Sequence, residues 1–253
     1  MRDAPTLRPE LPSLPVKPMK AAAGLAAGVA AAAWAVRGRS STVFAPSFWR
    51  GPRSRPFVAL TFDDGPSEST PDLLELLRDF GVSATFFQCG ANVRRLPAVA
   101  REVAAAGHEI GNHSDTHAFF CLRGSGFIEE QIRRAQEAIE IAAGVVPRFF
   151  RPPYGVRWFG LREAQRRLGL VGVMWSVLGL DWKLPGEAVA RRILSRIHNG
   201  AIVCLHDGRR LQPTPDVAAT IEAVRRLVPA LLARGFQFVT IGNLLCPRKS
   251  ETG

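Results

Sequence analysis

The chain has 253 residues, of which 47% are hydrophobic, and this excludes a generally disordered protein. The formal net charge is +11, which by itself suggests a nucleic acid or an anionic surface as a partner. Residues 1–56 hold nine Lys/Arg against two acids, however, so residues 57–253 carry 24 basic and 20 acidic residues, a net charge of only +4. Their arginines recur at helical spacing, which is typical of solvated helix faces. We therefore expect no nucleic-acid partner.

The first 56 residues form a separate tail by composition. Pro-rich residues 1–20 precede sixteen uncharged, mostly alanine residues, Ala21 to Val36. A helix of that length spans about 24 Å, which is less than a hydrocarbon core of about 30 Å. The stretch is also longer than the apolar region of a signal peptide, which typically has about 7–15 residues. We expect residues 21–36 to be a membrane-directing segment, either cleaved or retained as an anchor. The alternative is an alanine-rich helix that lies on the domain.

This expectation places the catalytic domain outside the cytoplasm, in the cell envelope. Residues 37–56 are basic and rich in Pro, Ser and Gly, which indicates a linker. The folded domain is then expected to begin at Phe57 and to occupy residues 57–253.

The remainder alternates short apolar runs with longer amphipathic ones. The apolar runs predict seven strands, at residues 57–62, 82–89, 108–113, 148–151, 170–177, 201–206 and 236–241. The amphipathic runs predict six helices, at 70–80, 92–106, 126–143, 160–168, 186–198 and 216–234. Glycines stand where these helices should end, at Gly81, Gly107, Gly144, Gly169, Gly200 and Gly235. The alternation predicts a parallel α/β architecture, and periodicity leaves open whether it is a closed barrel or an open sheet.

Polar residues follow several of these strands at their carboxyl ends, where α/β folds place their sites. In chain order they are Asp63-Asp64, His113 and His117, Arg151 to Gly155, Asp181-Trp182, and His206-Asp207. The order of the strands therefore brings three of the five histidines and several acids to one rim.

The spacing of His113 and His117 lets two imidazoles reach one metal ion, and a carboxylate completes a two-His, one-carboxylate set. Such a set suits Zn²⁺, with Co²⁺ or another divalent ion as alternatives, and it leaves positions open for water and substrate. Side chains alternate along a strand, so one of Asp63 and Asp64 is expected to face the metal and the other to hold the water as general base.

The remaining polar residues complete this hypothesis. His206 is a natural general acid that Asp181 would keep protonated, and Arg151 would orient the base carboxylate. His108 and His198 lack this context and are interpreted as structural. The cysteines, at positions 89, 121, 204 and 246, form no C-x-x-C pair, and Cys204 is expected to pack as a small hydrophobe.

Five ordered motifs, "TFDDGP", "HSDTH", "RPPYG", "LDW" and "CLHDG", resemble those of the polysaccharide deacetylase family with the NodB homology domain, carbohydrate esterase family 4. The resemblance covers about residues 55–245. It implies a distorted (β/α) barrel with about seven parallel strands and metal-dependent removal of acetyl groups from N-acetylglucosamine-type sugars. It also implies a role for each matching residue: Asp63 as base, Asp64, His113 and His117 as metal ligands, Ser114 as support for the histidine loop, Arg151 as partner of the base, Tyr154 as oxyanion donor through its backbone N–H, Asp181 as partner of the acid His206, and Trp182 with Leu205 as the apolar wall for the acetyl methyl.

Two departures from the family pattern stand out. Leu178 occupies a position, three before the "DW" aspartate, that is acidic in many relatives, and Cys204 replaces an aliphatic residue. Activity is expected to survive, with altered acid tuning or substrate preference. The expected substrate is peptidoglycan or a related envelope glycan. Chitooligosaccharides, exopolysaccharide, another amidohydrolase reaction, or glycan binding without catalysis are the alternatives.

Overall fold

The computed structural model describes residues 16–246 of the chain, with side chains from residue 23 onward. The predictions for residues 1–15 and 247–253 lie outside this part. The strands are β1 (Ser47–Phe48), β2 (Phe57–Asp63), β3 (Thr85–Gln88), β4 (Glu109–Asn112), β5 (Phe149–Phe150), β6 (Val171–Val173), β7 (Val177–Leu178), β8 (Ala201–His206) and β9 (Gln237–Phe238). The helices are α1 (Val16–Arg37), α2 (Thr70–Asp79), α3 (Gly90–Arg95), α4 (Pro97–Ala105), α5 (Ser125–Ala143), α6 (Leu161–Arg167), α7 (Gly186–Leu194), α8 (Ala218–Leu232), α9 (Ile241–Leu245) and the 3₁₀ turn η1 (Pro153–Gly155).

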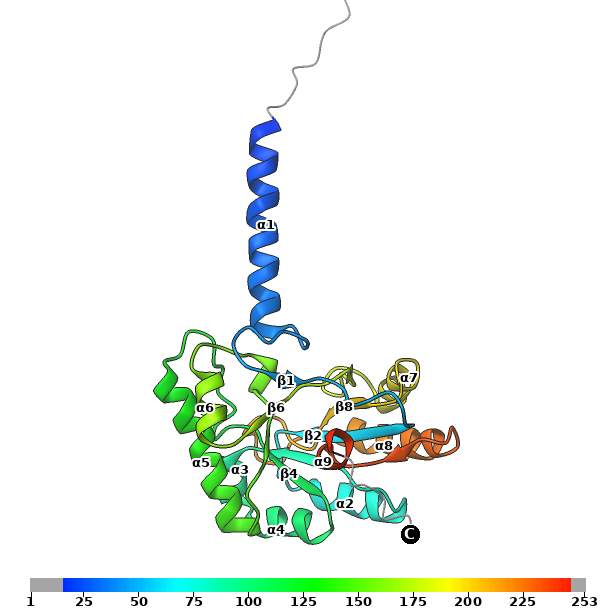
Figure 1. Cartoon of the computed structure of the whole chain (residues 1–253). Helices are drawn as coiled ribbons and strands as arrows, with labels where there is room; N and C mark the ends of the chain where they lie inside the picture. Colours follow the sequence, from blue (N-terminus) through cyan, green and yellow to red (C-terminus); the bar gives the residue numbers. More distant parts are fainter. Residues whose placement is uncertain (1–15, 247–253) are drawn as a thin grey trace, which may run out of the picture.

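All strand pairs in the described part are parallel, and they form one sheet in the order β1-β6-β5-β4-β3-β2-β8-β7, with β9 added beside β2. The sheet curls, and helices lie around its outside (Figure 1). This is the predicted distorted (β/α) barrel. The seven predicted strands are present, although the run at 170–177 divides into β6 and the start of β7.

Alternation along the central strands separates two layers of side chains. From β2, Val58, Leu60 and Phe62 enter the large core between the sheet and its outer helices. The alternate residue Ala59 belongs to a second cluster on the inner face, against Ile241 and Leu244 of α9. Thr61 and Asp63 continue this inner face, so Asp63 stands at the carboxyl end of the barrel interior.

The predicted helix at 92–106 is two helices. Leu96 leaves the helical conformation, with φ −128° and ψ 58°, and Pro97 begins α4. Proline is tolerated in the first turn of a helix, and it restricts the preceding residue to extended conformations. The predicted helix at 186–198 ends earlier, at Leu194, so Gly200 precedes β8 and does not end α7. The other predicted ends are close to the observed ones, and all six glycines named above have φ between 64° and 80°.

The packed structure begins before residue 57, contrary to the predicted linker at 37–56. Residues of β1 pair with β6, and Ala45 is fully buried in the cluster that includes Leu161 and Phe150. The buried guanidinium of Arg157 also donates to the carbonyls of Gly38 and Ser41. The pairing of a two-residue strand depends on distant partners, which local composition does not reveal.

Helix α1 extends away from the body and contacts it through its C-terminal end (Figure 1). Every residue from Ala23 to Trp34 is exposed, so the alternative of an alanine-rich helix lying on the domain does not hold for this stretch. Among residues 16–246, no helix combines the length and the apolar character needed to cross a bilayer.

Candidate metal centre and active site

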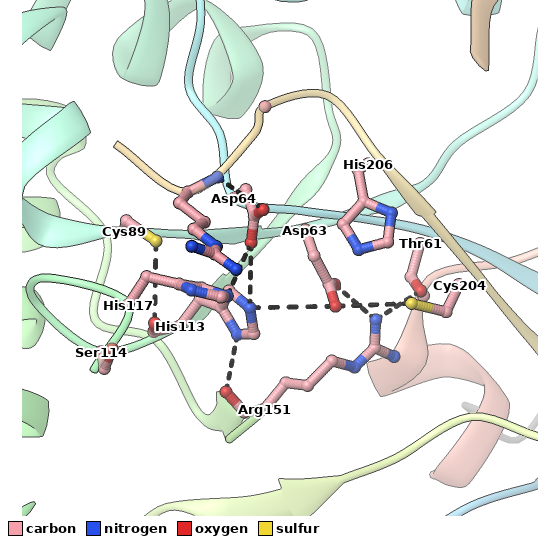
Figure 2. Close-up of polar contacts among 12 residues, drawn as sticks. Thr61, Asp63, Asp64, Cys89, His113, Ser114, His117, Arg151, Cys204 and His206 are labelled. Carbon is pink, nitrogen blue, oxygen red and sulfur yellow. Dashed lines mark hydrogen bonds and ion pairs between the residues drawn. The ribbon is translucent and has the colours of Figure 1, made fainter. Parts of the chain in front are cut away.

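Seven of the predicted site residues line one cavity of about 540 Å³ at the carboxyl ends of the strands: Asp63, Asp64, His113, His117, Tyr154, Trp182 and His206. Ser114, Arg151 and Asp181 are buried beside it. The structure therefore brings together residues that are as much as 143 positions apart in the sequence, and Figure 2 shows most of them converging.

Both acids of "TFDDGP" face this cavity, although strict alternation would turn them to opposite faces. Asp63 is the last residue of β2, and Asp64 adopts a left-handed backbone with φ 74°. That conformation is costly for a residue with a Cβ, on the order of 1–3 kcal/mol, and it redirects the second carboxylate toward the histidines. The two acids thus have different neighbours.

Asp64, His113 and His117 present one ligand atom each within 4.8 Å of one another. The Asp64 Oδ1 atom lies 3.0 Å from His117 Nε2 and 3.3 Å from His113 Nε2. His117 itself has φ 52°, and Ser114 between the histidines has φ 66°. Its Oγ has no hydrogen-bond partner in the described structure, whereas its backbone N–H donates to Asn112 Oδ1 at 2.9 Å. Ser114 supports the loop through its backbone.

The protonation pattern of these residues fits a cation. The Arg151 carbonyl can only accept, at 2.7 Å, so His113 Nδ1 carries the proton of that hydrogen bond. In the neutral imidazole the lone pair of Nε2 then points at Asp64 Oδ1, which is buried without a hydrogen-bond partner in the described structure. A cation between these two atoms would be bound by both, and a carbonyl behind a histidine is a usual support for a metal ligand.

The pKa shifts of His117 and Asp64 are consistent with a metal ion at this position. Burial lowers the pKa of His117 below its ordinary value despite the neighbouring Asp64, which favours the neutral imidazole that metals bind. Burial opposes the charge on Asp64, but the two histidines outweigh it and hold the pKa of that carboxyl well below its usual range. A carboxylate together with two imidazole nitrogens is a donor set that suits a divalent ion such as Zn²⁺.

Asp63 is held by a different group of residues. Arg151, fully buried, donates from Nη1 to Asp63 Oδ1 at 2.6 Å and to Thr61 Oγ1 at 2.7 Å. The thiol of Cys204 donates to the other carboxylate oxygen at 3.4 Å. Asp63 Oδ2 also lies 3.9 Å from His113 Nε2. A carboxylate beside the metal set, but bound by other residues, can accept a proton from a water molecule there.

His206 stands across the cavity and is paired with Asp181. Its Nδ1 lies 2.9 Å from Asp181 Oδ1, and Asp181 Oδ2 accepts from the His206 backbone N–H and from Thr220 Oγ1. Burial disfavours the charged imidazole, but Asp181, with smaller contributions from Asp64 and Asp63, raises the pKa of His206 to about 9. His206 can therefore donate a proton at neutral pH.

Aromatic rings form the walls of the cavity. Tyr154 has φ 58°, and its ring meets that of His117 edge-on at 4.5 Å between centroids. The ring of Trp182, 45% exposed, stands perpendicular to His206 at 5.0 Å. Trp175 also lines the cavity and was not predicted, because nothing in its local sequence distinguishes it from a core residue.

The prediction for Leu205 is wrong. On β8 the inward residues are Cys204 and His206, so Leu205 points outward into the core against the helices. Cys204, expected only to pack, therefore faces the cavity and contacts Asp63. Leu178, at the family's frequently acidic position, lines the cavity as well. The apolar wall beside Trp182 consists of Leu178 and Trp175 rather than Leu205.

Comparison with known proteins agrees with this site. The polysaccharide deacetylase family model matches residues 50–173. A chitooligosaccharide deacetylase of Sinorhizobium fredii is 38% identical over 189 residues, which are 72% of this chain and 88% of that protein. Among solved structures, the Bc1960 peptidoglycan N-acetylglucosamine deacetylase, crystallised with a hydroxamate-type N-oxidanyl-benzamide, matches with a TM-score of 0.75 and 30% identity, over 79% of this chain and 93% of that one.

A third neighbour is a carbohydrate esterase family 4 pseudoenzyme of Bacillus anthracis, with a TM-score of 0.72 and 29% identity over 80% of this chain and 70% of that one. Members of the family are divalent-metal-dependent hydrolases. The share of each chain covered, together with the five ordered motifs and the parallel barrel, assigns this protein to the polysaccharide deacetylase family, carbohydrate esterase family 4, as a deacetylase.

Proposed function

We propose that the protein hydrolyses the acetamide of N-acetylglucosamine units in peptidoglycan or a related envelope glycan and releases acetate, with Zn²⁺ as its metal. The observation that carries the proposal is the Asp64, His113 and His117 set, with Asp63 beside it and His206 across the same cavity. A metal set with a carboxylate outside it on one side and a protonated imidazole on the other is what amide hydrolysis requires.

Asp64, His113 and His117 would hold the metal, which supplies Lewis-acid polarisation of the acetamide carbonyl and acidifies water. Asp63 takes the proton of the attacking water, and Arg151 fixes the carboxylate for this task. The backbone N–H of Tyr154 donates to the oxyanion.

His206 then protonates the leaving amine, because amines leave poorly as anions. Asp181 keeps the imidazole charged and oriented through Nδ1, so the proton to be donated is on Nε2. Trp182, with Leu178 and Trp175, encloses the acetyl methyl.

The test is acetate release by the full chain from peptidoglycan and from N-acetylchitooligosaccharides. Activity should disappear on treatment with a chelator and return with Zn²⁺ or Co²⁺, and Asp63→Asn should be the inactive matched control. Metal binding without acetate from any glycan would contradict the proposal and would favour the alternative of a domain without catalytic activity.

We also propose that α1 associates with a membrane and that the domain acts outside the cytoplasm. Two observations support the membrane association. Residues 21–36 are uncharged, and the side chains of Leu25, Val29 and Trp34 are exposed. Flotation of the full chain with lipid vesicles should decrease when Leu25, Val29 and Trp34 are replaced by serine. Equal flotation of both proteins would contradict membrane association through α1.

A further inference from the structure

Three arginines line the active-site cavity. Arg37 is the last residue of α1, and Arg209 and Arg210 belong to the loop between β8 and α8. None of the three is part of the five sequence motifs, although Arg209 and Arg210 directly follow "CLHDG". Two segments that are about 170 residues apart therefore contribute positive charge to the same cavity.

The position of Arg37 is built into the fold. Buried Arg157 donates from its backbone N–H to the Val36 carbonyl at 3.0 Å and from its guanidinium to the carbonyls of Gly38 and Ser41. Arg39 donates to the Ser176 carbonyl at 2.5 Å. Because both sides of Arg37 are fixed to the body by buried or long-range hydrogen bonds, its guanidinium is held near the cavity rather than on a free tail.

The charges near the rim do not cancel. The guanidinium of Arg209 is already paired with Asp181, because it donates to the Asp181 carbonyl at 3.2 Å and lies 3.9 Å from Asp181 Oδ2. Within residues 16–246, no acidic side chain forms an ion pair with Arg37 or Arg210, and both are exposed.

The acids inside the cavity do not balance these two arginines. Asp63 is paired with Arg151, and Asp64 faces the histidines and the metal position. The guanidinium of Arg210 instead lies over the Tyr154 ring, 5.4 Å from its centroid, beside the site.

We propose that Arg37 and Arg210 bind a carboxylate of the glycan, carried by a sugar or its substituent next to the acetamide under attack. A guanidinium matches a carboxylate with two parallel hydrogen bonds, which a neutral sugar cannot offer. The cavity then selects acidic glycans, such as polymers in which every second sugar bears a lactyl carboxylate, over neutral chitooligosaccharides. This inference rests on the proposed deacetylase function.

The test uses two tetrasaccharides of alternating N-acetylglucosamine and N-acetylmuramic acid, one with free carboxylates and one as the methyl ester. Both offer the same acetamides and nearly the same shape. The wild-type protein with Zn²⁺ should show a kcat/KM about 5–20-fold higher for the acid at low salt, and ionic strength near 0.5 M should reduce that ratio because exposed charges are screened.

Arg37→Gln with Arg210→Gln should bring the ratio close to one by raising KM for the acid, with little change in kcat and with the methyl ester unaffected. Arg225→Gln is the matched control, because Arg225 is an exposed arginine of α8 that does not line the cavity. A version of the acid substrate with stem peptides has its lactyl carboxylate converted to an amide. It therefore distinguishes binding of the lactyl carboxylate from binding of carboxylates in the peptide.

Equal kcat/KM for acid and ester in the wild type would overturn the inference while leaving deacetylation intact, and so would a ratio that the double variant preserves. Failure of the proposed function looks different: no acetate from either tetrasaccharide. In that case calorimetry of the Zn²⁺-loaded protein with the acid and with the ester still tests the inference. The protein should bind the acid more tightly, and this preference should be lost in the double variant.

Discussion

Asp63 and Asp64 are consecutive in the chain, yet their carboxylates contact different partners. Asp63 Oδ1 accepts from Arg151 at 2.6 Å, whereas Asp64 Oδ1 lies 3.0 Å from His117 and 3.3 Å from His113. The left-handed backbone of Asp64 makes this possible, because both side chains then face one cavity. One strand end can thus supply a metal ligand and a base.

Replacement of the two acids should separate metal binding from turnover. Asp64→Ala removes the anionic ligand, so Zn²⁺ affinity should fall at least ~100-fold and activity with it. Asp63→Asn keeps the shape but cannot accept the proton, so the metal should stay bound while kcat falls by ~10²–10⁴. Metal content after dialysis and acetate release measure the two effects. Equal Zn²⁺ binding by both variants would show that this division of roles is wrong.

Activity should depend on pH through His206. Burial lowers the pKa of this imidazole, and Asp181 overcomes it to give a pKa of about 9. The acid form is therefore present below pH 9, and kcat/KM should fall as pH rises through that value. In Asp181→Asn the raising charge is removed and burial remains, so the basic limb should move to lower pH by ~1–2 units. A basic limb unmoved by this substitution would assign it to another group.

The same pair links pH to stability. Because the pKa of His206 in the folded chain lies above its ordinary value, the charged pair stabilises the protein fully below about pH 6.5. That contribution is lost as pH rises through about 9. Urea unfolding of Asp181→Asn should therefore show a weaker loss of stability between pH 7 and 9 than the wild type does.

Arg151 should matter for stability as well as turnover. It is fully buried, it bridges Thr61 and Asp63, and it lies 4.1 Å above the centre of the Phe87 ring. Arg151→Met leaves a buried carboxylate unpaired, which costs ~3–5 kcal/mol of unfolding free energy. Adding Asp63→Asn removes that charge, and part of the loss should be recovered. Urea unfolding of the four proteins measures this coupling, and strictly additive losses would contradict the pairing.

Local patterns in the sequence predicted the central strands, most helix ends and the convergence of the motifs on one rim. These features depend on apolar periodicity, on glycines at helix ends and on the geometry common to parallel sheets. The division of the helix at Leu96–Pro97 was also readable, because proline restricts the residue before it. The inward direction of Cys204 and outward direction of Leu205 likewise follow from alternation counted back from His206.

Other features have no local signal. Asp64, Ser114, His117 and Tyr154 adopt left-handed conformations that their residue types do not demand, and tertiary contacts impose them. The pairing of β1 with β6 joins segments more than 120 residues apart. Arg37 lines the cavity, and hydrogen bonds of Arg157 and Arg39 to distant residues fix the segment around it. Such relationships appear when the fold is complete.

Truncation should show where the packed unit begins. A chain of residues 36–253 keeps β1, buried Ala45 and the carbonyls that Arg157 contacts, so its Tm and acetate release should stay close to those of the full chain. A chain of residues 57–253 removes all three, so β6 loses its pairing with β1 and the guanidinium of Arg157 loses the carbonyls to which it donates. The lost strand pairing, the lost burial of Ala45 and the lost hydrogen bonds of a charged donor all lower the free energy of unfolding, so this shorter chain should unfold at much lower temperature or fail to fold. Equal thermal stability of the two truncated chains would mean that residues 36–56 add nothing to the stability of the domain.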